Sequence, residues 1–133
     1  MKYCVDTWFL IKLAQKDAKA LEIKRNAIEG KNRLFIPTIV ITEIFRKLYQ
    51  KGKKESDIES FLRNLIATEK IKTVFLDETI AKEAAKVSVS HSIPTVDSIV
   101  VATYINSEAD SILTDDYDIK KLSKKRAVRV ENW

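Results

Sequence analysis

Two acidic residues lie in stretches of the sequence that are otherwise apolar. Asp6 directly follows Tyr3–Val5, a run with the character of a short buried strand, and Glu43 lies between Ile41 and Ile44. Burying a carboxylate costs free energy unless a helix N-terminus, a basic side chain or a metal ion compensates its charge. Glu43 is the harder of the two to explain by packing alone, and both acids are therefore candidates for chemistry.

More acids follow predicted strands later in the chain. Asp115 and Asp116 come directly after residues 111–114, and Asp97 lies in the first turn of a predicted helix that opens at Pro94. Taken singly, Asp97 could complement a helix dipole, and Asp115, Asp116 and Asp118 could be ordinary turn residues. Gathered together, carboxylates resist ionising unless a cation joins them, and oxygen-only ligand sets suit Mg²⁺ or Mn²⁺. The acids together predict a divalent metal site.

The elements that position these acids follow from apolar periodicity and from the turn residues. The sequence predicts strands at 2–5, 33–36, 71–76, 111–114 and 127–130. It predicts helices at 7–16, 18–29, 38–50, 56–66, 78–90 and 118–122, and a further helix that starts at 94–95, with Thr38 as the N-cap of the third helix. Strands that alternate with helices predict an α/β fold with a central, mostly parallel β-sheet flanked by helices on both faces. Ligands of such folds bind beyond the carboxyl ends of the strands, where all the acids should converge.

Composition and length limit the class of protein. The chain has 133 residues, 45% apolar and 32% charged, which predicts one globular domain over 1–133. No apolar run approaches the roughly 18 residues of a membrane span, and the N-terminus does not resemble an export signal. The lone cysteine, Cys4, cannot form an internal disulfide and reads as a small core residue. These features predict a soluble cytoplasmic protein with no membrane association.

The charge pattern favours a polyanionic partner. The net charge is +5, and the basic residues cluster in two regions. One cluster lies along a predicted helix and contains Arg46, Lys47, Lys51, Lys53 and Lys54; the other lies near the C-terminus and contains Lys120, Lys121, Lys124, Lys125, Arg126 and Arg129. Either cluster alone is as compatible with a solvated surface as with binding.

Four segments, in this order and spacing, resemble the PIN domain, the fold of many small metal-dependent ribonucleases that include VapC-type toxins. They are V-D-T at 5–7, I-P-T-I-V-I-T-E-I at 36–44, P-T-V-D-S-I-V-V-A-T-Y-I at 94–105 and I-L-T-D-D-Y-D-I at 112–119. None is specific alone, but together they span essentially the whole chain. The resemblance implies a PIN-like fold.

The resemblance also implies roles for individual residues. The family's catalytic acids correspond to Asp6, Glu43, Asp97 and Asp116, of which Asp6, Asp97 and Asp116 would be metal ligands. The fourth acid follows the family pattern Thr-x-Asp-x-Asp-apolar at Thr114, Asp116, Asp118 and Ile119. Whether Asp115 or Asp118 shares its role stays open. Thr7, Thr114 and Ser98 would orient carboxylates or water by hydrogen bonds.

The function implied is Mg²⁺-dependent hydrolysis of RNA, with Mn²⁺ as a possible substitute, by the toxin of a VapBC-type toxin–antitoxin pair. Products would carry a 3′-hydroxyl and a 5′-phosphate. A nuclease that matures ribosomal or transfer RNA, and a silent module that binds RNA or protein, are the alternatives.

The implied partners are RNA, a cognate antitoxin and a second copy of the chain. Arg46 and Lys47 are candidates for phosphate contacts, because they lie three and four positions beyond Glu43 on one helix. Trp8 is either a core residue or part of a groove with Ile58, Phe61 and Leu65 that takes an antitoxin helix.

Overall fold

A five-stranded parallel sheet forms the centre of the computed structural model, which describes residues 1–133. Its strands are β1 (Lys2–Val5), β2 (Arg33–Pro37), β3 (Ile71–Val74), β4 (Ser111–Leu113) and β5 (Val130–Glu131), in the order β3-β2-β1-β4-β5. The helices are α1 (Thr7–Ala14), α2 (Ala18–Ile28), α3 (Thr38–Gln50), α4 (Glu55–Ile66), α5 (Glu78–His91), α6 (Thr95–Asn106) and α7 (Tyr117–Lys124). The predicted α/β class is confirmed, and every strand pair is parallel.

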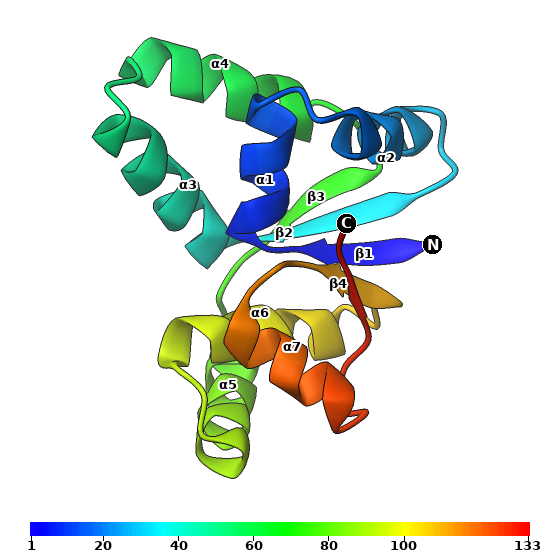
Figure 1. Cartoon of the computed structure of the whole chain (residues 1–133), viewed down its shortest axis with the longest axis vertical. Helices are drawn as coiled ribbons and strands as arrows, with labels where there is room; N and C mark the ends of the chain where they lie inside the picture. Colours follow the sequence, from blue (N-terminus) through cyan, green and yellow to red (C-terminus); the bar gives the residue numbers. More distant parts are fainter.

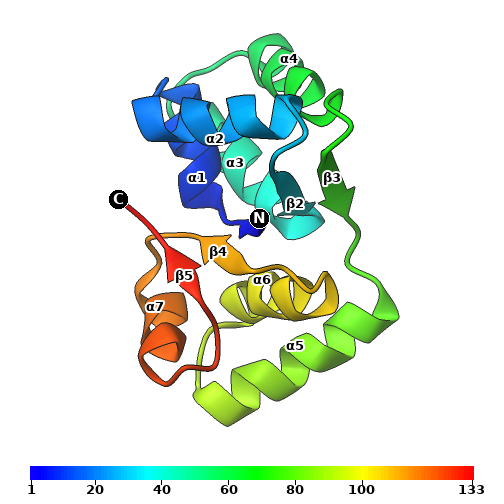
Figure 2. The same cartoon turned by 90° about the vertical axis from the view of Figure 1, so that its right-hand side faces the viewer.

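The helices form two layers. Helices α1–α4 lie on one side of the sheet and α5–α7 on the other (Figure 1; Figure 2 shows the layers from a second side). The chain moves outward from β1 to β2 and β3, and then returns through α5 and α6 to place β4 on the opposite side of β1. This reversal between β1 and β4 is the switch point at which parallel sheets open a crevice beyond their carboxyl ends.

The central strands are buried on both faces, which explains their continuous apolar sequences. In β1, Cys4 is fully buried and its thiol lies 3.7 Å from the carbonyl oxygen of Val100 in α6. Helix α6 packs against both α5 and the sheet, and Val100–Thr103 are all buried. A helix enclosed in this way needs no polar face, as its sequence predicted. No helix of the structure has both the length and the apolar character needed to cross a membrane.

The predicted elements differ from the structure mainly at their ends. Thr38 is not an N-cap: it is the first residue of α3, and its hydroxyl accepts a hydrogen bond from the Leu76 N–H at 3.2 Å. Asp116 caps α7, since its side chain accepts from the Ile119 N–H at 3.0 Å. The helix therefore starts at Tyr117, one residue before the predicted start.

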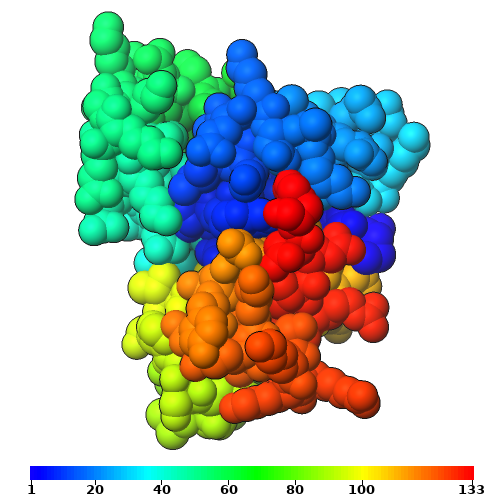
Figure 3. All heavy atoms as spheres, viewed as in Figure 1, coloured from blue at the N-terminus to red at the C-terminus, as the bar shows by residue number.

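The last residues cross back over the first helices. Figure 3 shows the C-terminal end (red) resting against the surface of the first residues (blue). The Trp133 ring lies 4.8 Å from that of Trp8 between centroids and 6.2 Å from that of Phe9. Its indole N–H donates a hydrogen bond to the Asp17 carboxylate at 2.8 Å. These contacts join the two ends of the described chain beside α1.

Candidate active site

Asp6 lies where β1 ends and caps the N-terminus of α1. One carboxylate oxygen accepts a hydrogen bond from the Thr7 N–H at 2.8 Å, and the other accepts from the Thr114 hydroxyl at 2.6 Å. The side chain is nearly buried. These donors compensate the charge that burial would otherwise disfavour, and each oxygen keeps a lone pair for a further ligand.

A chain of hydrogen bonds links Asp6 to acids on other elements. The Thr7 hydroxyl donates to Glu43 Oε1 at 2.9 Å, so α1 orients a carboxylate of α3. On the other side of Asp6, Thr114 Oγ1 accepts from the Asp116 N–H at 3.0 Å. Thr7 and Thr114 therefore lie where supporting residues were predicted. The Ser98 hydroxyl, by contrast, donates to the Pro94 carbonyl within α6 at 2.9 Å and contacts no carboxylate.

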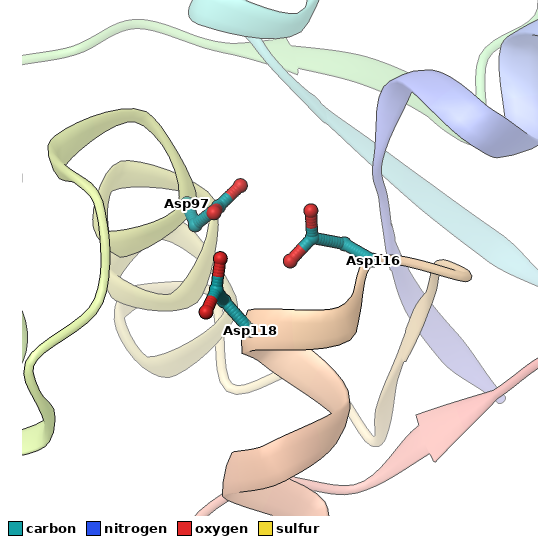
Figure 4. Close-up of side chains that lie close together, drawn as sticks. All are labelled: Asp97, Asp116 and Asp118. Carbon is teal, nitrogen blue, oxygen red and sulfur yellow. The ribbon is translucent and has the colours of Figure 1, made fainter.

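Three aspartates point toward one another beyond the end of β4. Asp97 comes from the first turn of α6, while Asp116 and Asp118 come from the start of α7 (Figure 4). One carboxylate oxygen from each lies within 4.8 Å of the other two. Asp118 also forms an ion pair with Lys121 at 3.2 Å, whereas Asp97 and Asp116 form none. The cluster lacks the positive charge that would balance it.

Asp115 and Asp118, whose roles the sequence left open, have different surroundings in the structure. Asp118 joins the cluster of Asp97 and Asp116. Asp115 borders the same hollow, but one of its oxygens binds Lys120 Nζ at 2.9 Å and accepts a weaker contact from the Asn132 amide at 3.5 Å. Asp118 is therefore the one that clusters with Asp97 and Asp116, whereas Asp115 lines the hollow and is paired with Lys120.

The acids line one hollow at the carboxyl ends of β1 and β4. Its walls are formed by Asp6, Thr7, Trp8, Glu43, Lys47, Asp97, Asp115 and Asp116. All four acids expected to act together are present. Lys47 is the predicted phosphate contact that reaches the hollow, and Arg46 does not line it. Trp8 is a lining residue that sequence reasoning missed, because an aromatic residue in an apolar segment reads as core.

Burial and mutual repulsion make the hollow a poor place for uncompensated negative charge. Loss of hydration raises the pKa of Asp97 from its usual 3.8 to about 7, and repulsion from Asp116, Asp6, Asp118 and Glu43 adds to the effect. Burial also raises the pKa of Asp6, although the hydrogen bonds from Thr114 and Thr7 oppose the shift. A divalent cation would reverse this repulsion, and the all-oxygen donor set fits Mg²⁺ or Mn²⁺.

The sequence of residues 3–125 matches the family model described as PIN domain. This match covers most of the chain. The chain belongs to the PIN domain family. The resemblance that the four sequence segments indicated is thereby confirmed.

Solved structures share the PIN fold of the chain. VapBC2 from Rickettsia felis, bound to a DNA fragment from its promoter, has a TM-score of 0.76 and 18% identity, covering 100% of this chain and 99% of that one. VapBC-1 from nontypeable Haemophilus influenzae has a TM-score of 0.67 and 18% identity, covering 100% and 98%. VapC20 of Mycobacterium tuberculosis, described as a sarcin–ricin loop cleaving toxin, has a TM-score of 0.66 and 16% identity, covering 90% and 94%. Comparison with curated proteins gave no match.

Proposed function

We propose that this PIN domain protein is a Mg²⁺-dependent endoribonuclease and the toxin of a VapBC-type toxin–antitoxin pair. The observation that carries the proposal is the convergence of Asp97, Asp116 and Asp118 to within 4.8 Å, without a cationic partner for the first two. Three carboxylates in this arrangement suit a divalent cation. The similar folds of two VapBC structures and of a toxin described as cleaving the sarcin–ricin loop support the choice of substrate and of system.

The residues divide into ion-holding and positioning groups. Asp97 and Asp116, assisted by Asp118 and by the nearby Asp6, would hold the ion. A bound divalent ion would lower the pKa of water and stabilise negative charge on the oxygen that leaves phosphorus. Glu43, held by the Thr7 hydroxyl at 2.9 Å, would accept a hydrogen bond from the attacking water.

Thr114 fixes Asp6 in orientation and also binds the Asp116 backbone. This double contact ties the end of β1 to the start of α7. Thr114 is thus a positioning residue that acts through the carboxylates and does not touch the RNA.

Lys47 should contribute to RNA binding and Arg46 should not. Carboxylates repel phosphates, so cations near the hollow must supply the attraction, and only Lys47 of the two lines it. In an Asp97→Asn background, in which we expect cutting to be too slow to disturb a binding measurement, Lys47→Ala should weaken binding of a labelled oligoribonucleotide about threefold. It should also reduce the slope of affinity against salt by about one counterion.

The matched control for Lys47→Ala is Arg46→Ala, which removes an exposed cation from the neighbouring position of α3. Fluorescence anisotropy over a salt series measures both variants. Equal losses in the two variants would show that α3 attracts RNA only through its overall charge, and would remove the specific assignment to Lys47.

Two apolar surfaces outside the hollow are the proposed protein interfaces. A groove formed by α1, α3 and α4 would take an apolar segment of the antitoxin; it is lined by Ala14, Leu48, Lys53, Asp57, Ile58 and Phe61. Of the four residues that the sequence predicted for this groove, Ile58 and Phe61 line it. Trp8 does not line it, and Leu65 is buried. A second surface along α5, with Leu76 and Val89 exposed, would pack against another copy in a homodimer.

Cleavage of a panel of defined RNAs in Mg²⁺ by the purified protein, with both product ends mapped, tests the proposed function. We expect cutting at internal positions that leaves 3′-hydroxyl and 5′-phosphate ends. Maturation-type trimming of precursor ribosomal or transfer RNA would instead identify a processing enzyme. RNA binding without any cutting would identify a silent module.

A further inference from the structure

We propose that Trp8 is a specificity-determining residue that stacks on the base of the nucleotide next to the scissile phosphate, and that Trp133 holds it in place. This inference deepens the proposed function and rests on it. It gives a role to Trp8, the aromatic residue that lines the acidic hollow. Metal-dependent hydrolysis alone does not require an aromatic side chain there.

Trp8 is placed at the chemistry by its position in the chain. It lies two residues after Asp6, in the first turn of α1, and lines the hollow together with Asp6, Glu43 and Asp97. Its neighbour Phe9 is completely buried and does the packing of this turn, whereas Trp8 is only partly buried. Trp8 packs against the core on one side and lines the acidic hollow on the other, so part of this large aromatic side chain is available to a ligand.

The Trp8 ring packs against a residue from a distant part of the sequence. The Trp133 ring lies 4.8 Å away between centroids with the planes inclined at 59°. Trp133 is itself anchored by its hydrogen bond to Asp17 and by its edge-on contact with Phe9. A ring fixed before the ligand arrives loses little conformational entropy when a base stacks on it.

Cations accompany this ring, as they do in sites that bind single-stranded nucleic acids. Lys12 Nζ lies over the Trp8 ring at 5.9 Å from its centroid, and Lys47 lines the same hollow. Aromatic rings that stack on bases, with lysines that meet the backbone, form the usual combination for an unpaired strand. The apolar groove that suits a protein partner lies elsewhere and does not include Trp8, so the observations favour RNA as its ligand.

The chain has only two tryptophans, and both belong to this pair, so intrinsic fluorescence reports on it directly. In the Asp97→Asn background, a short single-stranded oligoribonucleotide should quench this fluorescence, and the same backbone with abasic nucleotides should not. Trp8→Leu should weaken binding of the oligoribonucleotide about tenfold and leave binding of the abasic strand unchanged. Trp8→Phe, which keeps an aromatic face, should stay within about threefold of the background protein.

Two controls keep the test specific. Phe75→Leu removes an exposed aromatic residue that lines none of the hollows and should change neither affinity. Thermal unfolding of Trp8→Leu should show a folded protein. If that variant does not fold, the tryptophan fluorescence of the background protein decides, because equal quenching by the normal and the abasic strand would overturn the stacking role.

The outcomes separate this inference from the proposed function. Equal RNA affinity with and without the Trp8 ring, or equal losses for the normal and abasic strands, would overturn the stacking role and leave the nuclease intact. A background protein that binds neither strand would overturn both.

Discussion

Asp97→Asn should lower kcat/KM for RNA cleavage in Mg²⁺ by at least about a hundredfold. The substitution keeps the shape of the side chain and removes the charge that would hold the cation. Asp97 is also the only member of the aspartate cluster that comes from α6. Asp116 and Asp118 both lie at the start of α7, so neither can replace a carboxylate that comes from α6. Initial rates on one defined RNA measure the effect.

Asp115→Asn is the matched control, because it removes the same charge from the same edge of the sheet. Asp115 is paired with Lys120 at 2.9 Å and does not belong to the three-aspartate cluster. Its loss should change kcat/KM by no more than about threefold. Equal losses in Asp97→Asn and Asp115→Asn would show that cleavage depends on the total negative charge of this region and not on the three-aspartate cluster.

Without a divalent cation, the protein should become less stable as the pH rises from about 4 to about 7. The folded protein raises the pKa of Asp97 from 3.8 to about 7, so within this interval the folded state holds a proton that the unfolded chain has lost. Stability from this group is therefore full below about pH 4 and is lost as the pH rises through about 7. Asp97 is partly exposed, and with solvent screening we expect a loss of about 1–2 kcal/mol.

Denaturant unfolding in EDTA at about pH 5 and about pH 8 measures this loss. Asp97→Asn has no proton to lose, so its free energy of unfolding should exceed that of the parent at the higher pH and approach it at the lower pH. Mg²⁺ should raise the stability of the parent mainly at the higher pH, because metal ligands must be deprotonated. A parent that gains stability relative to Asp97→Asn as the pH rises in EDTA would contradict the predicted sign.

The gathering of the acids could be predicted from sequence because it depends on topology. Strand β1 must deliver Asp6, and β4 must deliver Asp116, to the same edge of a parallel sheet. Asp97 lies in the first turn of α6 and Glu43 just over one turn into α3, so their approximate places near that edge follow as well. None of these placements needs the conformation of a side chain.

The finer assignments could not be predicted, because they depend on details of local geometry. Whether Asp115 or Asp118 joins the cluster depends on where α7 begins and on the ion pair between Asp115 and Lys120. Whether Arg46 or Lys47 faces the hollow depends on the rotation of α3 about its axis.

The place of Trp8 depends on a contact with Trp133, at the far end of the sequence. No local pattern connects two residues so distant in the chain. Thr114 was predicted to orient a carboxylate, but its choice of Asp6 depends on the pairing of β1 with β4.

The acidic hollow is a feature that lowers stability. Loss of hydration, together with repulsion among the carboxylates, raises the pKa of Asp97, and apolar or salt-bridged residues in these positions would avoid both effects. Proteins keep such unfavourable arrangements where function requires them. The gain in stability expected for Asp97→Asn at alkaline pH, together with its loss of activity, would be the signature of this trade-off.

The most direct test of the account is the rate at which the purified protein cuts one defined RNA in Mg²⁺, after removal of metal with EDTA, and after Mg²⁺ is restored. We predict cutting in Mg²⁺, no cutting in EDTA and full recovery on restoration, with Asp97→Asn at least about a hundredfold slower in Mg²⁺. Cutting that persists in EDTA, or that survives in Asp97→Asn, would contradict the assignment of the hollow as a metal-dependent nuclease site.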